Sequence, residues 1–423
     1  MDLVEERTIV NISERRPHRI RRKGEDMEMA ESAGKMMEEE FTPELIEEMK
    51  SKKGLKLRVE NHCFNEEATR GAIRRFADGI GDSNSLWRDK EYGKGTRYGC
   101  IIAPPSWVFS VLAGIQFGWR GLAGFHSASE MEFYKPIRLN DKIRPEETFL
   151  DFEGPKTSQF AGRMVFDYFE DKYFNQNEEL VAKVIRLVIR TERRAARKKG
   201  KYHKIELPHP WSEKELKAIE DEVLSEEIRG ANPRYWEDVE VGDELRPVVK
   251  GPLGLTDIVA MCVAGLAPAK LTAHGVALRE YRKKPAWAFR DTKTYALEPI
   301  YAVHYNKQAA NAMGLPYSYD VGTQRHCWQI HLLTNWMGDE GWLKKSKAEY
   351  RRFVYLSDVV WVTGKVTKKY VDEGGEHCVD IETHAMNQRG EDTMPGTATV
   401  VLPLKNEHEE MWPAARRLDK KSP

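Results

Sequence analysis

The chain has 423 residues with 67 basic and 67 acidic side chains, a sequence pI near 7.2 and a mean hydropathy of −0.63. Balanced charge excludes the strongly basic surface of a dedicated nucleic-acid binder, and a hydrophobic content of 40% is enough to fill the cores of two or three domains. No window of 18 residues is continuously apolar and the N-terminus has no apolar signal core, so we expect a cytoplasmic protein that does not enter membranes.

The cysteines and the short motifs exclude several kinds of site. The five cysteines lie at least 37 residues apart, which favours neither a disulfide framework nor a paired-cysteine zinc site. The phosphate-loop, dinucleotide-loop, serine-elbow and zincin motifs are absent from the sequence. His326 and His331 fall on one predicted helix without a third ligand at metal spacing. We therefore expect no metal and no redox cofactor.

Three segments lie outside the predicted domains. Residues 1–42 mix basic runs with MMEEE and are predicted to form an N-terminal arm, and residues 405–423 a C-terminal tail. Residues 191–230 are predicted to be a linker, which has a basic stretch and then a helix opened by Ser212. The basic stretch is better explained as a solvent-exposed connection between domains than as a contact with nucleic acid or with the phosphates of a ligand. The domains are then 43–190, which opens on a helix capped by Thr42 with Pro43 in its first turn, and 231–404.

An internal repeat relates the two predicted domains. Residues 132–135 (EFYK) are followed by 139–141 (LND), and 217 residues later 349–352 (EYRR) are followed at the same spacing by 356–358 (LSD). Asn-Gln pairs at 175–176 and 387–388 fall in equivalent predicted turns, 212 residues apart. Two copies of one domain explain this order better than two unrelated domains.

Each copy follows the same plan of one apolar helix and several strands. Residues 106–119 and 328–337 are apolar on nearly all sides, which is typical of a buried helix. Alternating runs separated by short turns follow each of them, as expected of an antiparallel meander. The pattern predicts an α+β fold in which each sheet wraps around a long buried helix and the sheet edges of the two copies pair.

Particular segments resemble a known family. Residues 76–87 (FADGIGDSNSLW), followed by IAPP at 102–105, resemble the N-terminal half of MaoC-like acyl dehydratases, which are hot-dog proteins that act on acyl thioesters. Residues 234–243 (RYWEDVEVGD) resemble the opening of a second MaoC-like hot dog, and 319–325 (YDVGTQR) are similar to one bacterial branch of the group. The resemblance extends from about Pro43 to Leu404 and implies a tandem (double) hot-dog fold.

The resemblance also implies a chemistry. Hydration of a 2-enoyl thioester needs a base for water, an acid for the α-carbon and donors for the thioester oxygen. In MaoC-like hydratases the first two come from a motif Asp-x-Asn-Pro-x-His, and the donor is a glycine N–H just before the buried helix. Unpaired amides and the helix dipole favour negative charge at that place.

This chain divides the motif between its halves. The first copy keeps Asp82 and Asn84 and has Trp87 where the histidine is expected. The second copy keeps His304 but has Pro299 at the aspartate position. The resemblance therefore implies His304 as acid/base, with Glu298 or Asp82 as the candidate carboxylate and Gly322 as the oxyanion donor. The substrate-binding candidates are Asn84, Trp87, Asn306, Asp320 and Arg325.

Structural roles remain open for most of these residues. Asp82 and Asn84 could cap a helix or close a turn, and Trp87 could pack in a core. His304 could be a satisfied core histidine. Arg325 could hold CoA phosphates or a substrate carboxylate, or pair with Asp320.

The sequence therefore predicts reversible hydration of 2-enoyl-CoA to 3-hydroxyacyl-CoA, by a hydro-lyase that meets CoA only as part of its substrate. The alternatives are a hot-dog acyl-CoA thioesterase, or a non-catalytic acyl-CoA-binding or supporting subunit. We expect a homo-oligomer, a dimer of double hot-dogs, without a nucleic-acid or membrane partner.

Overall fold

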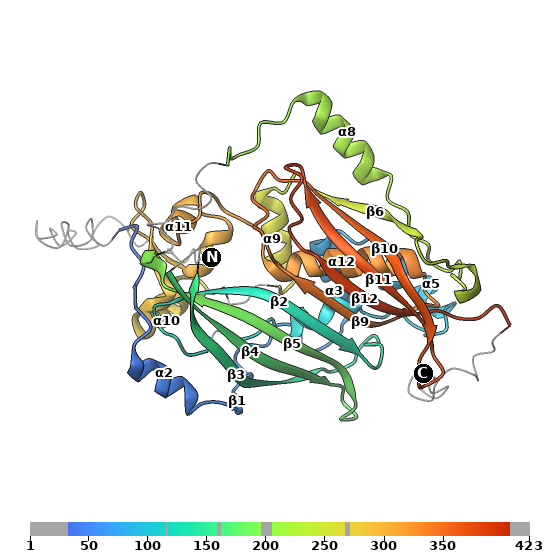
Figure 1. Cartoon of the computed structure of the whole chain (residues 1–423), viewed down its shortest axis with the longest axis horizontal. Helices are drawn as coiled ribbons and strands as arrows, with labels where there is room; N and C mark the ends of the chain where they lie inside the picture. Colours follow the sequence, from blue (N-terminus) through green and yellow to red (C-terminus); the bar gives the residue numbers. More distant parts are fainter. Residues whose placement is uncertain (1–32, 116, 159–161, 196–204, 267–270, 407–423) are drawn as a thin grey trace, which may run out of the picture.

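One continuous antiparallel sheet runs through the protein in the computed structural model, which describes residues 33–115, 117–158, 162–195, 205–266 and 271–406 (Figure 1). Within these residues the sheet has ten strands in the order β1-β3-β4-β5-β2-β9-β12-β11-β10-β6. The strands are β1 (Leu55–Leu57), β2 (Ala123–Phe133), β3 (Arg144–Ser158), β4 (Gly162–Phe174), β5 (Leu180–Thr191), β6 (Glu244–Lys250), β9 (Trp342–Glu349), β10 (Val360–Val371), β11 (His377–Asn387) and β12 (Gly396–Val401). A separate two-stranded sheet pairs β7 (Ala288–Arg290) with β8 (Leu297–Pro299).

The helices pack around and inside this sheet. They are α2 (Pro43–Lys50), α3 (Arg70–Ile80), α4 (Ser85–Arg88), α5 (Lys90–Lys94), η2 (Pro105–Trp107), α6 (Val108–Val111), α8 (Glu213–Leu224), η3 (Trp236–Asp238), α9 (Leu255–Val263), α10 (His274–Lys283), η4 (Pro285–Trp287), η5 (Ile300–His304), α11 (Lys307–Ala312) and α12 (Gly322–Met337). In Figure 1, strands β9 to β12 cover α12, every residue of which after Gly322 is buried. This is the predicted hot-dog arrangement of the second copy.

Local sequence signals explain where two of the helices begin. Thr42 accepts a hydrogen bond from the Leu45 N–H and Pro43 occupies the first turn of α2, as predicted. Ser212 and Glu215 form a reciprocal capping box that opens α8. The part of the N-terminal arm that the structure describes is packed rather than frayed, since Met36 and Phe41 are both buried. The rest of that arm, and most of the basic stretch of the linker, lie outside the described residues, so the predicted domain boundaries stay a prediction.

The two copies join edge to edge through β2 and β9, as predicted. Within this pairing Glu130 lies opposite Lys347, which follows it by 217 residues, the offset of the sequence repeat. A residue that pairs with its own counterpart lies on the two-fold axis that relates the copies. The bridges Ile102↔Arg138 and Tyr319↔Tyr355 have the same offset on both sides, which fixes the equivalence of the two halves.

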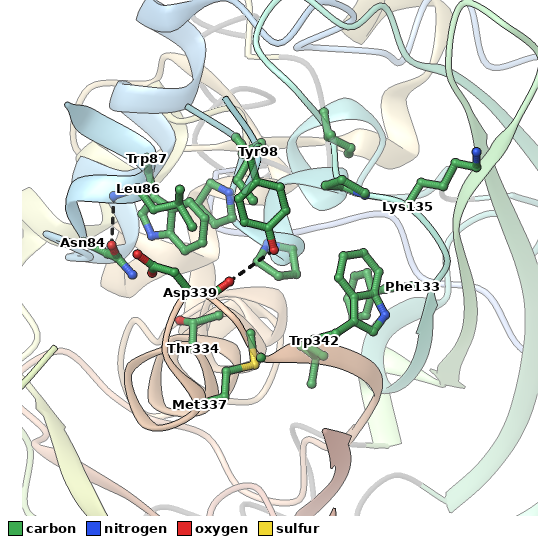
Figure 2. Close-up of a pocket in the computed structure, with 18 of the residues that line it drawn as sticks. Asn84, Leu86, Trp87, Tyr98, Phe133, Lys135, Thr334, Met337, Asp339 and Trp342 are labelled. Carbon is green, nitrogen blue, oxygen red and sulfur yellow. Dashed lines mark hydrogen bonds between the residues drawn. The ribbon is translucent and has the colours of Figure 1, made fainter. Parts of the chain in front are cut away.

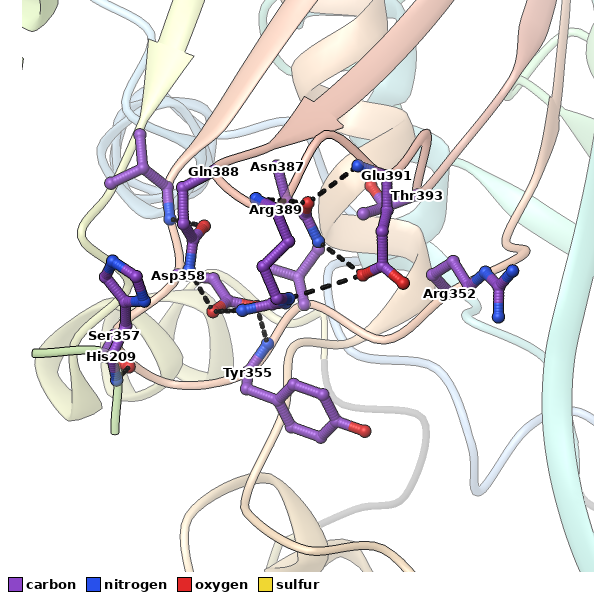
Figure 3. A network of polar contacts seen from close by, with 12 residues as sticks. His209, Arg352, Tyr355, Ser357, Asp358, Asn387, Gln388, Arg389, Glu391 and Thr393 are labelled. Carbon is purple, nitrogen blue, oxygen red and sulfur yellow. Dashed lines mark hydrogen bonds and ion pairs between the residues drawn. The ribbon is translucent and has the colours of Figure 1, made fainter. Parts of the chain in front are cut away.

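The repeat extends to individual hydrogen bonds. Asp141 accepts from the Gln176 side chain at 2.8 Å, and its counterpart Asp358 accepts from Gln388 at 2.7 Å. Among the residues that the structure describes, the second copy alone adds a side-chain cation, because Arg389 donates through both Nη atoms to the fully buried Asp358 carboxylate (Figure 3). The short matches found in the sequence are therefore residues that hold the same turns together.

Asp358→Asn should destabilise the protein by about 2–3 kcal/mol, because it leaves the half-buried Arg389 without its bidentate partner. Asp141→Asn is the matched control in the first copy, where Arg138 donates only its backbone N–H to the carboxylate, and should cost about 1 kcal/mol. Denaturant unfolding of the two variants checks the order. Equal losses would contradict a special role for the Arg389 pair.

The first copy departs from the predicted long helix. Residues 106–119 were predicted to be helical throughout, but the helical backbone ends at Val111, and Leu112 is extended. Gly114, Gly118 and Trp119 then adopt left-handed backbone angles, which an α-helix does not accept. The prediction of a long buried helix in each half is therefore wrong for the first copy and correct for the second.

Charged side chains lie in the first copy where the longer helix of the second copy would continue. Arg186 on β5 bonds Glu147 and Asp171, and Arg190 on the same face bonds Asp167. The counterparts of the first three in the second copy are the small residues Ala398, Gly364 and Thr383. Small side chains leave room for α12, whereas a paired cluster replaces the helix in the first copy.

Candidate active site

A cavity of about 240 Å³ lies between the two halves. One wall comes from η5, the start of α12 and the segment after β9 in the second half, and the other from β2, β4 and β5 in the first. Its charged and titratable side chains are His126, Arg186, His304, Asp320, Arg325, Tyr319, Tyr350, Arg351 and Arg352. Four of the sequence candidates, His304, Asp320, Gly322 and Arg325, thus meet at one place.

His304 ends the short helix η5 and is held in one orientation. Its Nδ1 lies 2.9 Å from the Tyr319 carbonyl oxygen, which can only accept, so Nδ1 carries the proton and Nε2 has a free lone pair. The rings of Tyr301 and Tyr319 contact the imidazole in tilted and edge-on orientations, at centroid distances of 4.7 and 4.8 Å. Burial lowers the pKa of His304 to about 4, so the imidazole is neutral at physiological pH. A neutral ring with a free nitrogen is suited to accept a proton.

Gly322 is the first residue of the long buried helix α12. The first N–H groups of a helix have no partner within it, and the dipole places partial positive charge there. Gly322 is also in close contact with Tyr350, because a Cβ at this position would lie 2.8 Å from its ring. The start of α12 thus lines the cavity with its first N–H groups, and the role of Gly322 as oxyanion donor stays a prediction.

Asp320 and Arg325 form a buried ion pair, which was the structural alternative. The Arg325 Nε donates to Asp320 at 2.6 Å, and Nη1 donates to the carbonyls of Arg352 and Thr393. Nη2 has no hydrogen-bond partner among the described residues, so it remains available to a ligand. The ligand role of Arg325 stays a prediction.

The first half has an equivalent but much smaller cleft of about 40 Å³. Trp87 precedes His304 by 217 residues, and Pro105 has the same relation to Gly322, so the equivalent cleft lacks the imidazole and, at the helix start, the N–H donor. Figure 2 shows Trp87, Phe133, Met337 and Trp342 crowding this space.

Asp82, Asn84 and Trp87 serve the packing of the first half. Trp87 donates its indole N–H to Asp82 at 2.9 Å, and Asn84 caps α4 by accepting from the Leu86 N–H. Asp82 lies in the core, with His331 Nε2 3.6 Å away, and does not line the large cavity. Asn84 and Trp87 line only the small cleft.

Two further candidates also lie off the large cavity. Glu298 is half-buried on β8, where burial and then Asp291 raise its pKa. Asn306 caps α11 and donates its side-chain amide to Asp291 at 3.0 Å. Asp320 is therefore the only carboxylate among the described residues that line the cavity with His304.

Residues of the first half that line the cavity were not found from the sequence. A bulge in β2 between His126 and Ala128 places His126 and Ser127 at the cavity. His126 Nε2 is 2.8 Å from Ser129 Oγ, which also receives the Tyr350 hydroxyl, so this histidine is a satisfied part of the wall. Neither spacing nor composition in the sequence indicated this bulge.

Comparisons with known proteins agree with the fold. Residues 59–184 match the family model described as the FAS1-like dehydratase domain region. A solved MaoC-like dehydratase aligns with a TM-score of 0.56 at 15% identity, covering 84% of this chain and 99% of that one. The chain has the double hot-dog fold of the MaoC-like dehydratases. A MaoC domain dehydratase of Chloroflexus aurantiacus aligns with a TM-score of 0.50 at 12% identity, covering 84% of this double hot-dog chain and 96% of that one.

Curated relatives align with less than a third of this chain. A UPF0336 protein of Streptomyces avermitilis is 27% identical over 132 residues, which is 29% of this chain and 85% of that protein. A UPF0336 protein of Streptomyces coelicolor is 28% identical over 137 residues, 30% of this chain and 88% of that one. Together with the family model, the fold supports a hydro-lyase kind of activity.

The described part of the chain contains no helix with the length and apolar character needed to cross a membrane.

We expect one ligand per chain, although the fold is duplicated. The cleft with Trp87 and Pro105 is small and lacks the groups that the other cleft provides. Calorimetric titration with a non-hydrolysable acyl-CoA analogue should therefore saturate at one equivalent. Two equivalents of equal affinity would contradict this expectation.

Proposed function

We propose that this double hot-dog protein catalyses the reversible hydration of a 2-enoyl-CoA to a 3-hydroxyacyl-CoA at the His304 cavity. The observation that carries the proposal is that a neutral histidine with a free Nε2 lines the same cavity as the N-terminus of the buried helix. The match of the first half to a dehydratase region supports the reaction class.

A single acid/base group can serve both steps of this reaction. His304 Nε2 takes a proton from water as the water oxygen bonds to the β-carbon, and charge then collects on the thioester oxygen. The Gly322 N–H and the α12 dipole stabilise that oxygen. The imidazolium returns its proton to the α-carbon, so one water has been added and His304 is neutral again. Dehydration follows the same path in reverse, without the aspartate that Pro299 replaces.

The pH dependence should report the lowered pKa of His304. The base is active in its neutral form, so kcat/KM should stay level as pH falls from 8 to about 5 and drop only as it approaches the His304 pKa of about 4. Rates measured after brief transfer to each pH limit the effect of acid unfolding. A midpoint at or above about 6.5, the ordinary histidine value, would contradict this assignment.

A substrate panel tests the reaction itself. Enoyl-CoA and 3-hydroxyacyl-CoA thioesters are incubated with the protein, a mass change of one water is recorded, and free thiol is measured in parallel. Addition or loss of water without thiol release is the expected result. Thiol release would instead identify a thioesterase.

The absence of the motif aspartate favours one alternative, a non-catalytic acyl-CoA-binding subunit. Pro299 stands at the aspartate position, and Asp320 is engaged by Arg325. Binding of acyl-CoA without turnover would support this second function. In both cases we propose an acyl-CoA ligand, a homo-oligomer of double hot-dogs, no redox cofactor and a cytoplasmic location.

A further inference from the structure

The wall of the cavity that faces the α12 start contains a buried guanidinium, that of Arg186. This side chain is 3% exposed, and among the charged cavity residues it is the one that comes from the first half. Its Nε donates to Asp171, and its Nη2 to Asp171 and Glu147. Nη1 has no hydrogen-bond partner among the described residues.

Arg186 occupies space that only the first half offers. The helix there ends at Val111, and the chain passes the guanidinium at Gly114, where a Cβ would lie 2.2 Å from Arg186 Cζ. The counterpart of Arg186 in the second half is Ala398, under the intact helix. The hot-dog fold therefore does not itself require a cation here.

The charges around Arg186 restrict what its free nitrogen can bind. Burial raises the pKa of both Glu147 and Asp171, and both carboxyl groups already bond the one guanidinium of Arg186. A ligand carboxylate at Nη1 would be a third carboxyl group beside this single cation, whereas a hydroxyl or ketone oxygen accepts the Nη1 hydrogen bond without adding charge.

The Arg186 guanidinium and the acid/base group lie on different walls of the cavity. Ala113, Met164, Val188 and Ile189 line the first-half wall together with Arg186, whereas His304 and Gly322 lie on the second-half wall. An acyl group that runs from a thioester at Gly322 to the first-half wall would meet these apolar side chains and the Arg186 Nη1 donor, whereas Arg325, Arg351 and Arg352 lie on the opposite, second-half wall.

We propose that the protein selects acyl thioesters whose acyl group bears a hydroxyl or ketone oxygen away from the thioester, and that Arg186 Nη1 recognises this oxygen. This selection rests on the proposed function for the thioester end of the ligand. Arg186 is thereby a specificity-determining residue, and it has no part in the proton transfers of His304.

The test compares thioesters of matched chain length that end in a methyl, hydroxymethyl, methyl ketone or carboxylate group. Affinity is measured by calorimetry, and turnover is measured separately, each over a series of chain lengths. The wild-type protein should bind the hydroxyl- or ketone-bearing member roughly ten- to a hundredfold more tightly than the methyl-terminated one of equal length. Equal or better binding of the methyl-terminated member, or preference for the carboxylate, would overturn the proposal.

Variants separate recognition from folding. Arg186→Lys keeps a cation for Asp171 and Glu147 but removes Nη1, so it should lower affinity for the hydroxyl- or ketone-bearing thioester far more than affinity for the methyl-terminated one, and thereby abolish the preference. Arg190→Lys is the matched control, because Arg190 is equally buried on the same face of β5 but does not line the cavity. A loss of affinity for both thioesters alike in Arg186→Lys would show a structural role only and overturn the proposal. Selective binding without turnover would refute the proposed reaction but support Arg186 recognition.

Discussion

His304→Ala should lower the rate of hydration by roughly 10² to 10⁴ and leave the fold intact, because it removes the one free acid/base nitrogen identified at the cavity. His304→Gln fills more of the space and should lose a similar factor, which separates the chemistry from the packing between Tyr301 and Tyr319. Stopped assays with one enoyl-CoA, together with melting curves of each variant, give the two measurements.

The control for this experiment lies in the same cavity. His126→Gln replaces a second histidine, half-buried at the cavity, whose Nε2 already bonds Ser129, so it should reduce hydration far less than His304→Gln. Near wild-type activity of His304→Ala with an unchanged melting curve would refute His304 as the acid/base group. A larger loss in His126→Gln would move that role to the first half.

Gly322→Pro should lower kcat by roughly 10² to 10³ relative to Gly322→Ala, because proline removes the N–H proposed to stabilise the thioester oxygen. The backbone tolerates proline at the first helical position, and the extended Val321 suits a residue before proline. Both variants place a Cβ against Tyr350, so the alanine variant accounts for that contact. Steady-state kinetics of both proteins give the ratio.

Equal activities of the two Gly322 variants would show that this N–H is not used. A fall in affinity with an unchanged kcat would instead give the start of α12 a role in binding alone. The protein itself provides a precedent for the substitution, since Pro105 stands at the equivalent position of the first half and starts a folded helical turn.

The fold could be predicted because a duplicated domain repeats short motifs at fixed spacing, and these can be recognised without knowledge of long-range contacts. Asp141 and Asp358, with their Gln partners, repeat at fixed spacing since each closes the same turn. The prediction of a helix over 106–119 was wrong because an apolar run has the same sequence pattern whether its buried backbone is helical or irregular. The decisive residues are elsewhere in the sequence, in the buried charges of β3, β4 and β5 that replace the missing helix.

The candidate site could be predicted only where one local motif supplied it. His304, Asp320, Gly322 and Arg325 belong to the second copy and do meet at one cavity. Glu298 was a candidate because it adjoins the aspartate position of the His304 motif, and Asp82 because it keeps that aspartate in the first copy. Neither side chain lines the cavity. His126 and Arg186 escaped detection because a β-bulge and a strand of the other half bring them there, and strand pairing across 217 residues leaves no local signal.

The pairing of Glu130 with Lys347 also bears on how such a site can change over generations. In a dimer of identical single hot dogs, every mutation appears in both subunits, so a proline at the helix start would disable both clefts together. Because this chain carries its two copies in one gene, the same mutation alters one cleft and spares the other. The copy that no longer catalyses the reaction can then lose part of its helix and acquire buried charged side chains. Its residues can in this way come to line the site of the other copy and determine which substrate binds there.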